Sequence, residues 1–126
     1  QCWMNETQLD RTAWRLVQQI LAHESGALSV EELSYRNPEI ECETVDYHLR
    51  ELERQSLTER RSVDGGPNEL PSTYWAVTEC GVRRLDDLGF YDEIEVLEVA
   101  DDALERTDRI ERIEQFEERP TVDVSP

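Results

Sequence analysis

Side chains that can bind phosphate or read the edges of bases gather in one segment of the sequence, between residues 43 and 61. Four arginines lie there, Arg50, Arg54, Arg60 and Arg61. A guanidinium group can form two parallel hydrogen bonds with a phosphate or with the edge of a guanine. The residue types in this segment therefore predict recognition of a nucleic acid.

Groupings typical of a catalytic centre are missing from the sequence. It contains no Gly-rich phosphate loop, no Cys–His or Ser–His grouping with an evident orienting acid, and no cluster with metal-ligand spacing. We therefore predict a protein that is not an enzyme and that uses neither a cofactor nor a metal.

Cys42 is the candidate redox residue, because it stands at the start of a predicted helix. A helix N-terminus lowers the pKa of a thiol, but the flanking Glu41 and Glu43 oppose that effect. Two interpretations stay open, a thiol that senses oxidants and a small residue that simply fits.

Two helices are expected ahead of this segment. Apolar residues recur at helical spacing over residues 10–23, which predicts a first amphipathic helix. Ser29 and Glu32 have the spacing of a capping box, which predicts a short helix over residues 30–35.

A third helix is expected over residues 42–55, with Val45, Leu49 and Leu52 on its buried side. At about 100° per residue, the opposite side is polar and aromatic. The residues of this outward face are candidate contacts to bases and phosphates: Glu43, Thr44, Tyr47, Arg50 and Arg54. The alternative is an ordinary solvated helix face.

A β-hairpin is expected next, with strands over residues 57–63 and 72–77 and turn residues at 64–67. Its candidate phosphate contacts are Arg60, Arg61, Ser72 and Thr73. Their alternative role is that of ordinary exposed strand residues.

Three helices followed by a hairpin is the order of a winged helix. The stretch ETVDYHLRELERQSLTERR resembles the recognition helix and first wing strand of the ArsR, MarR and PadR regulators. Their pattern V-x-x-H-L-x-x-L is held here by Val45, His48, Leu49 and Leu52, and a Leu and a basic strand follow. His48 therefore joins the candidate DNA contacts.

The segment TYWAVTECGVRRLDDL resembles the end of the same families' domain, where a strand leads through T-E-x-G into a helix. Thr78, Glu79 and Gly81 hold those places. One departure is Ser56, where the families usually have glycine, and it leaves the turn geometry open. The resemblance covers residues 9–90.

The resemblance implies an α+β fold, mainly α with a small β-hairpin, and a sequence-specific regulator of transcription that binds double-stranded DNA. The alternative is a winged-helix adaptor that docks on another transcription component without binding DNA. Residues 1–8 are expected to be a flexible N-terminus, with residues 1–3 as an extension before Met4, and residues 120–126 a disordered tail.

Residues 91–119 are expected to form a long helix or two consecutive ones. An apolar stripe on this segment needs a partner surface, and it resembles the dimerisation helix of haloarchaeal PadR-like regulators, some of which act in the response to oxidants. A second copy of the chain would cover the stripe in a homodimer, and the alternative is that it folds back on its own domain. The candidate dimerisation residues are Ile94, Leu97, Leu104, Ile110, Ile113 and Phe116.

The charge balance is strongly acidic, with 30 acidic residues, 13 basic residues and a net charge of −17. Every basic residue is arginine. This composition resembles that of proteins from salt-accumulating microbes such as the haloarchaea, although an ordinary acidic protein without lysine is the alternative. Molar salt screens the repulsion between surface carboxylates. We expect solvent cations at the DNA interface, where carboxylates approach phosphates.

The sequence has no apolar run of about 18 residues that could cross a bilayer, and its first ten residues do not resemble a signal peptide. A cytoplasmic protein without a membrane partner is therefore expected.

Overall fold

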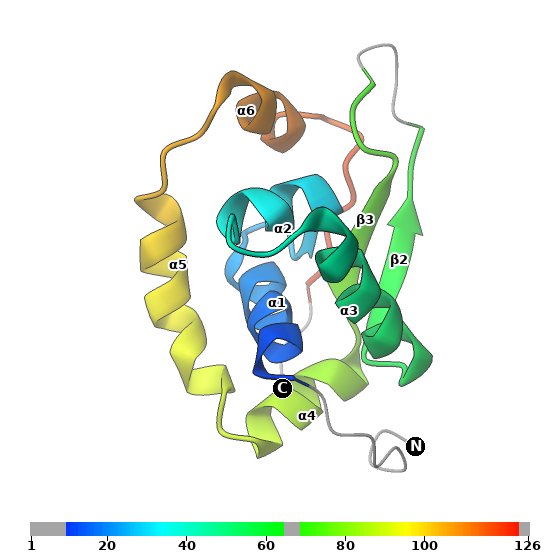
Figure 1. The fold of residues 1–126 in the computed structure, drawn as a ribbon, viewed down its shortest axis with the longest axis vertical. Helices are drawn as coiled ribbons and strands as arrows, with labels where there is room; N and C mark the ends of the chain where they lie inside the picture. Colours follow the sequence, from blue (N-terminus) through cyan, green and yellow to red (C-terminus); the bar gives the residue numbers. More distant parts are fainter. Residues whose placement is uncertain (1–9, 65–68, 124–126) are drawn as a thin grey trace.

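Three N-terminal helices and a small sheet form the centre of the molecule (Figure 1). The structure is a computed structural model, and it describes residues 10–64 and 69–123. Its helices are α1 (Arg11–Ala22), α2 (Val30–Arg36), α3 (Cys42–Arg54), α4 (Glu79–Asp87), α5 (Ile94–Asp102) and α6 (Asp108–Glu114), with a 3-10 turn, η2 (Tyr91–Glu93). Its strands are β1 (Ala27–Leu28), β2 (Thr58–Ser62) and β3 (Thr73–Val77). The mainly α winged-helix fold predicted from the sequence is confirmed.

The start of α2 is fixed by the predicted capping box. Ser29 Oγ accepts a hydrogen bond of 3.2 Å from the Glu32 backbone N–H, and the Ser29 N–H donates to Glu32 Oε1 at 3.0 Å. Both bonds satisfy groups that a helix start leaves without a partner. The capping box therefore sets where the chain leaves β1 and enters α2.

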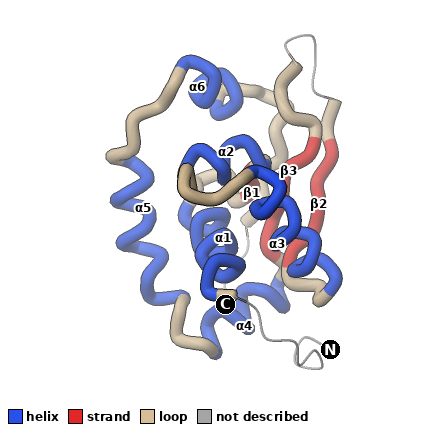
Figure 2. Tube along the Cα trace, in the orientation of Figure 1, coloured by secondary structure: helices blue, strands red, loops and turns tan. Residues whose placement is uncertain are grey.

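The sheet has the antiparallel order β1-β3-β2, and its strands gather on one side of the helices (Figure 2). The register places Arg60 opposite Trp75 and Arg61 opposite Tyr74. Strand β1 was not expected, because its two residues, Ala27 and Leu28, are too few to show an alternating pattern. The tip of the predicted hairpin, residues 65–68, lies outside the described residues.

The main core is built from the apolar stripes of α1 and α3 together with the inner face of the hairpin. Leu16, Leu49 and Leu52 are fully buried, and Trp75 is exposed by only 1%. The periodicity of both helices therefore predicted correctly which side faces inward.

The C-terminal segment folds back on its own chain, as in the alternative to burial of its apolar residues against a second copy. Helix α5 packs beside α1 and adds Ile94 to the main core (Figure 1). Ile110 and Ile113 of α6 are buried in a second cluster that includes Tyr74. These three isoleucines are therefore not available to a partner.

The other candidate dimerisation residues are all partly buried: Leu97, Leu104 and Phe116. Leu97 lies against the main core and Phe116 against the second cluster. Helix α5 ends at Asp102, and a new helix, α6, begins at Asp108. Thr107 caps α6, because its hydroxyl oxygen accepts a hydrogen bond of 3.2 Å from the Ile110 N–H. Of the two predicted alternatives, the second, two consecutive helices, is the one observed.

The chain beyond α6 is ordered through Asp123, whereas a disordered tail was expected from residue 120. The Val122 N–H donates to the Ser25 carbonyl oxygen at 2.7 Å. A Cβ atom on Gly26, whose φ is +70°, would stand 1.9 Å from the Val122 carbonyl oxygen. Glycine therefore allows the tail to pass close to the turn between α1 and β1.

Among the described residues, no helix has both the length and the apolar character needed to cross a membrane.

Candidate nucleic-acid interface

Helix α3 presents a polar and aromatic face to solvent. Its side chains at positions 43, 44, 47, 50 and 54 are exposed, and Tyr47 is 60% exposed. The opposite stripe, which contains Val45 and Leu49, is fully buried against the main core. The outward face that the sequence predicted for this helix is therefore open to a ligand.

His48 is an exception among the predicted contacts, because it is buried and only 9% exposed. Its Nε2 lies 3.9 Å from Asp10 Oδ2 at the start of α1, and its ring lies edge-on to that of Tyr47. His48 lies three residues after Val45 and four before Leu52, and residues at these spacings share one face of an α-helix. His48 is therefore held between α3 and α1, unlike the exposed predicted contacts, and its assignment as a DNA contact stays a prediction.

The arginines of α3 are held by acids of the same helix. Arg50 Nε donates to Asp46 Oδ2 at 2.7 Å, and Arg54 Nη1 lies 2.7 Å from Glu51 Oε2. The hydrogen bond to Asp46 raises the pKa of Arg50 above its ordinary value. Exposed ion pairs of this kind contribute little to the stability of the fold. A phosphate can therefore replace the carboxylate as the partner of the arginine.

The first wing strand continues this surface. Arg60 Nε donates to Glu53 Oε2 at 2.9 Å, and its guanidinium lies 5.7 Å from the centre of the Trp75 ring. Arg61 Nη2 donates to Glu59 at 2.7 Å. Both arginines are exposed, but successive strand residues face opposite sides of the sheet. Arg60 lies beside α3, whereas Arg61 lies on the other side, near Thr121 and Val122.

On the returning strand, the predicted contacts Ser72 and Thr73 differ in exposure. Ser72 is exposed and Thr73 is partly buried. Both stand at the start of β3, where Thr73 pairs with Ser62 of β2. Both residues line the cleft described below.

The turn between α3 and β2 fixes the wing against α3. Ser56 has a φ of +63°, the left-handed conformation that favours glycine. The Thr58 hydroxyl donates to the Leu49 carbonyl oxygen at 3.1 Å. This region of the backbone is therefore tied directly to the last turns of α3.

Gly81 allows α4 to close over the same turn. A Cβ atom there would stand 2.3 Å from the Leu57 carbonyl oxygen. Thr78 caps α4 by accepting the Gly81 N–H at 3.0 Å. The glycine of the T-E-x-G pattern thus lets the backbone of α4 pass close to the backbone at Leu57.

Cys42 is exposed at the first position of α3, and its Sγ lies 3.1 Å from Ser34 Oγ. The acids on either side, Glu41 and Glu43, are exposed as well. The geometry leaves the thiol accessible and does not distinguish the two interpretations of its role.

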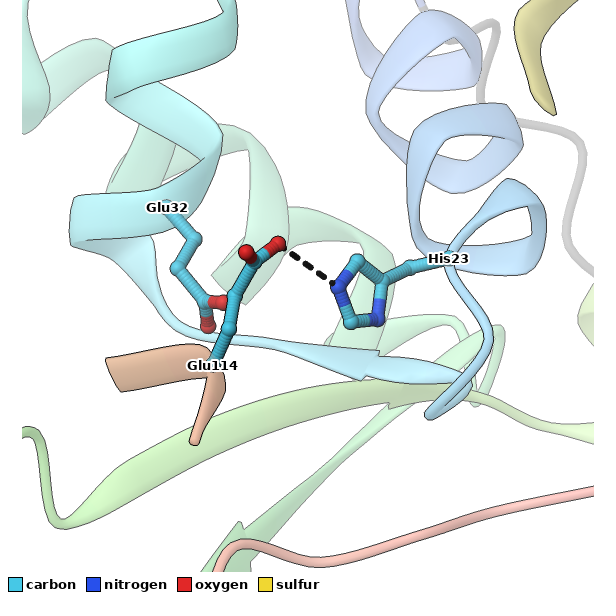
Figure 3. A group of neighbouring side chains, drawn as sticks. All are labelled: His23, Glu32 and Glu114. Carbon is cyan, nitrogen blue, oxygen red and sulfur yellow. Dashed lines mark hydrogen bonds and ion pairs between the residues drawn. The ribbon is translucent and has the colours of Figure 1, made fainter. Parts of the chain in front are cut away.

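One group of side chains has the composition of a metal site. His23, Glu32 and Glu114 each offer a ligand atom, and these atoms lie within 4.8 Å of one another (Figure 3). Arginines already occupy the carboxylates, since both oxygens of Glu32 accept from Arg119 at 3.0 Å and Glu114 accepts from Arg106.

The imidazole of that group is engaged too. His23 Nε2 lies 3.2 Å from Glu114 Oε2, and because a carboxylate only accepts, Nε2 carries the hydrogen at this contact. Burial raises the pKa of Glu114, but hydrogen bonds from Arg106 and His23 outweigh burial and hold the pKa below its ordinary value. The residues fit a charge-balanced structural cluster better than a metal ion.

Sequence reasoning missed one cation beside the predicted contacts. Arg109 of α6 donates to both carboxylate oxygens of Glu31, at 2.8 and 3.0 Å, and to the Glu69 carbonyl oxygen in the wing at 3.0 Å. Nothing in the sequence pattern places residue 109 next to residues 31 and 69, because that approach depends on how α6 folds back.

Comparison with solved structures gives two matches. A protein with a GntR superfamily winged-helix-turn-helix domain, from Halomicrobium mukohataei, is 40% identical to this chain with a TM-score of 0.86, over 91% of this chain and 82% of that one. ZitR from Lactococcus lactis, in its E41A mutant form, is 17% identical with a TM-score of 0.52, over 87% of this chain and 69% of that one. At 17% identity the likeness concerns the fold alone.

No family model and no curated protein matches the chain. The predicted resemblance is therefore confirmed for the winged-helix fold and for a haloarchaeal relative, whereas the PadR-like type stays a prediction. Because 40% identity extends over most of both chains on the same fold, the chain belongs to the GntR superfamily of winged-helix-turn-helix proteins.

Proposed function

We propose that this protein is a sequence-specific DNA-binding regulator of transcription, with α3 as its recognition helix. The observation that carries the proposal is the exposed face of α3, which bears Tyr47 and Arg50 on a winged-helix framework. A helix of 13 residues is about 20 Å long and fits the major groove.

Each side chain on this face has a chemistry suited to DNA. Arg50 can pair with guanine, Thr44 and Tyr47 can contact a thymine methyl group or a phosphate, and Glu43 can accept from cytosine. The side chains of the wing suit the phosphate backbone, because Arg60 and Arg61 carry charge and the serine and threonine beside them carry hydroxyl groups.

We further propose that cations enter the interface when DNA binds. Arg50, Arg60 and Arg61 each form an ion pair with a carboxylate of the same chain. When such an arginine turns to a phosphate, its carboxylate is left near the DNA and attracts a cation. This exchange suits a salty cytoplasm, which is the location that the arginine-only basic set favours.

The proposal includes a homodimer, whose contact surface differs from the one predicted from the sequence. Helix α5 exposes Val96 by 71% and Val99 by 70%, and a second copy could cover them and set two recognition helices about one DNA turn apart. Sedimentation of the variant carrying Val96→Asp and Val99→Asp tests this, since a dimer formed through α5 becomes a monomer and any other assembly keeps its mass.

A role in the response to oxidants rests on Cys42 and has its own test. If the thiol senses oxidants, peroxide changes DNA affinity in the natural protein and leaves the Cys42→Ser variant unchanged. Equal behaviour of the two proteins assigns Cys42 the role of a small fitting residue.

The central experiment measures DNA binding by gel retardation at molar KCl, with fragments of the source genome. We expect specific retardation, a large loss for Arg50→Gln with altered base preference, and little change for Arg15→Gln, an exposed arginine of α1 that lies outside the proposed interface. The absence of retardation with every fragment would contradict DNA binding and favour a protein-binding adaptor.

A further inference from the structure

A cleft of about 410 Å³ lies between the recognition helix, the wing and α6. Three arginines from three separate elements line it: Arg50 of α3, Arg60 of β2 and Arg109 of α6. Trp75, which Arg60 covers, and the residues Ser72 and Thr73 complete the wall on the side of the wing. The cleft thus joins the predicted DNA contacts to a helix that the sequence assigned to dimerisation.

The donors of this cleft are only partly used. Within the described part of the chain, Arg50 and Arg60 make their side-chain hydrogen bonds through Nε alone, to Asp46 and Glu53. Among the described residues, no side-chain hydrogen bond engages the two terminal nitrogens of either guanidinium. Several arginine donors form a donor set suited to the oxygens of a phosphate.

The charge of the cleft differs from that of the molecule. Its wall holds the three arginines and three acids, Glu31, Asp46 and Glu69, so it is neutral on a chain whose net charge is −17. An anion in the cleft therefore meets less repulsion than on the surrounding acidic surface. If one of the three acids moves out of the cleft, the net charge of its wall becomes positive.

Arg109 makes the cleft a composite site. It holds Glu31 at the start of α2 with two hydrogen bonds and the Glu69 carbonyl oxygen of the wing with a third. Its side chain is 35% exposed, so the guanidinium is both positioned and accessible. A phosphate in the cleft could replace the Glu31 carboxylate, while the contact to Glu69 keeps the arginine in place.

We propose that this cleft seats a phosphate group, namely a phosphodiester of the bound DNA, and that Arg109 makes α6 part of the DNA-binding surface. The proposal rests on the proposed DNA-binding function for the source of the phosphate, and on the cleft alone for its chemistry. Arg109 touches the backbone and not a base edge, so it adds affinity without sequence preference.

The test compares Arg109→Gln with Arg112→Gln, which removes the same charge from an exposed position of the same helix. Fluorescence anisotropy at molar KCl measures affinity for the preferred duplex and for an unrelated duplex of equal length. We expect Arg109→Gln to weaken both by about fivefold to tenfold, as for one lost phosphate contact, with their ratio unchanged. Thermal melting and circular dichroism show whether both variants keep the fold.

A third variant acts in the opposite direction. Glu31→Gln frees Arg109 from its carboxylate and should raise affinity for both duplexes several-fold, a gain that unfolding cannot produce. Equal losses for the two arginine variants, or no loss for Arg109→Gln, would overturn the proposal and leave only the long-range effect of charge.

A second arm works without DNA. Pyrophosphate is titrated into the protein while NMR follows the Nε–H signals of the three arginines. Shifts that saturate in the natural protein and disappear in Arg109→Gln support a phosphate site, and if the protein retards no DNA they assign the site to a free phosphate compound. The absence of shifts together with unchanged DNA affinity in Arg109→Gln would refute the cleft even if DNA binding holds.

Discussion

At the scale of single residues, Ser56 shows how one position sets the turn that joins the recognition helix to the wing. Its φ of +63° is costly for any residue with a side chain beyond hydrogen, by about 1 kcal/mol. The serine thus adopts a left-handed conformation that glycine accepts at no steric cost, and the turn holds a small amount of backbone strain.

Replacing Ser56 by glycine should therefore stabilise the protein by about 0.5–1 kcal/mol, since relief of the strain exceeds the added freedom of the unfolded chain. Chemical denaturation at constant salt measures the change. Ser62→Gly is the matched control, because Ser62 is exposed in a regular strand, and there glycine should lower stability by a similar amount. A loss of stability in Ser56→Gly would mean that the serine side chain contributes to the turn.

Residue types and helical spacing were enough to predict the outward face of α3, because the position of a side chain around a helix follows from its number. The same spacing places His48 on the buried side, three residues after Val45 and four before Leu52, whereas the family motif had suggested a DNA contact. Arg109 and Arg119 were missed for another reason. Arg119 pairs with Glu32, 87 residues away, and no local pattern reports so distant a contact.

At the scale of elements, the sequence predicted each helix of the winged-helix domain and both strands of the hairpin, because caps, turns and apolar periods are local signals. The C-terminal helices were predicted as helices, but whether their apolar residues meet their own domain or a second copy was left open. An apolar stripe shows that a helix side is buried, but the stripe alone does not distinguish a second copy of the chain from the helix's own domain. Ile110 and Ile113 of α6 pack with Tyr74 and Ala76 of β3 in the second cluster.

The tail is fastened to that cluster by Arg119, whose side chain is 6% exposed and pairs with the fully buried Glu32. The Arg119→Met variant leaves the Glu32 charge buried without its partner, which should cost about 3–5 kcal/mol. Thermal or urea unfolding measures this loss. Arg112→Met is the control and should change stability by less than about 0.5 kcal/mol.

The double variant Glu32→Gln with Arg119→Met keeps the prediction specific, since it removes both charges and should recover part of the loss. If the single variant is as stable as the natural protein, the buried pair does not hold the tail.

The junction of α5 and α6 should be the acid-sensitive part of the fold. Burial raises the pKa of Asp101 and of Glu114, but their arginine partners, Arg36 and Arg106, outweigh burial and leave both pKa values below the ordinary range. The ion pairs Arg36–Asp101, at 2.5 Å, and Arg106–Glu114, at 3.2 Å, therefore stabilise the fold only while the carboxylates are charged.

A group with a lowered folded pKa contributes stability that is present above its ordinary pKa and is lost as the pH falls through the folded value. We expect this stabilisation to be complete at neutral pH and to decline below about pH 4. Melting temperatures measured against pH show the decline, which should be shallower in Glu114→Gln. Glu111→Gln, an exposed acid of α6, should follow the natural protein, and an equally steep decline in Glu114→Gln would contradict this account.

At the scale of the whole molecule, the proposed function brings together an acidic protein and DNA, which is negatively charged as well. The chain carries a net charge of −17, yet the arginines of its exposed recognition surface are each paired with a nearby carboxylate. Ordinary DNA binding releases counterions from the phosphates and weakens steeply as salt rises. In the proposed interface, every arginine that turns to a phosphate leaves behind an acid that attracts a cation, so we expect uptake of cations to oppose their release.

We therefore expect DNA affinity to fall little, or to rise, between about 0.5 and 2 M KCl, because uptake at the acids cancels release from the phosphates. Anisotropy titrations across this range measure the slope of affinity against salt. In the variant carrying Asp46→Asn and Glu53→Gln, two acids that pair with Arg50 and Arg60 no longer attract cations. Its affinity should be higher at low salt and should fall more steeply as salt rises, whereas Glu95→Gln, an exposed acid on α5, should leave the slope unchanged. A steep fall in the natural protein, equal to that of the double variant, would show that its acids take up no cations and that their pairing with the arginines serves only the unbound state.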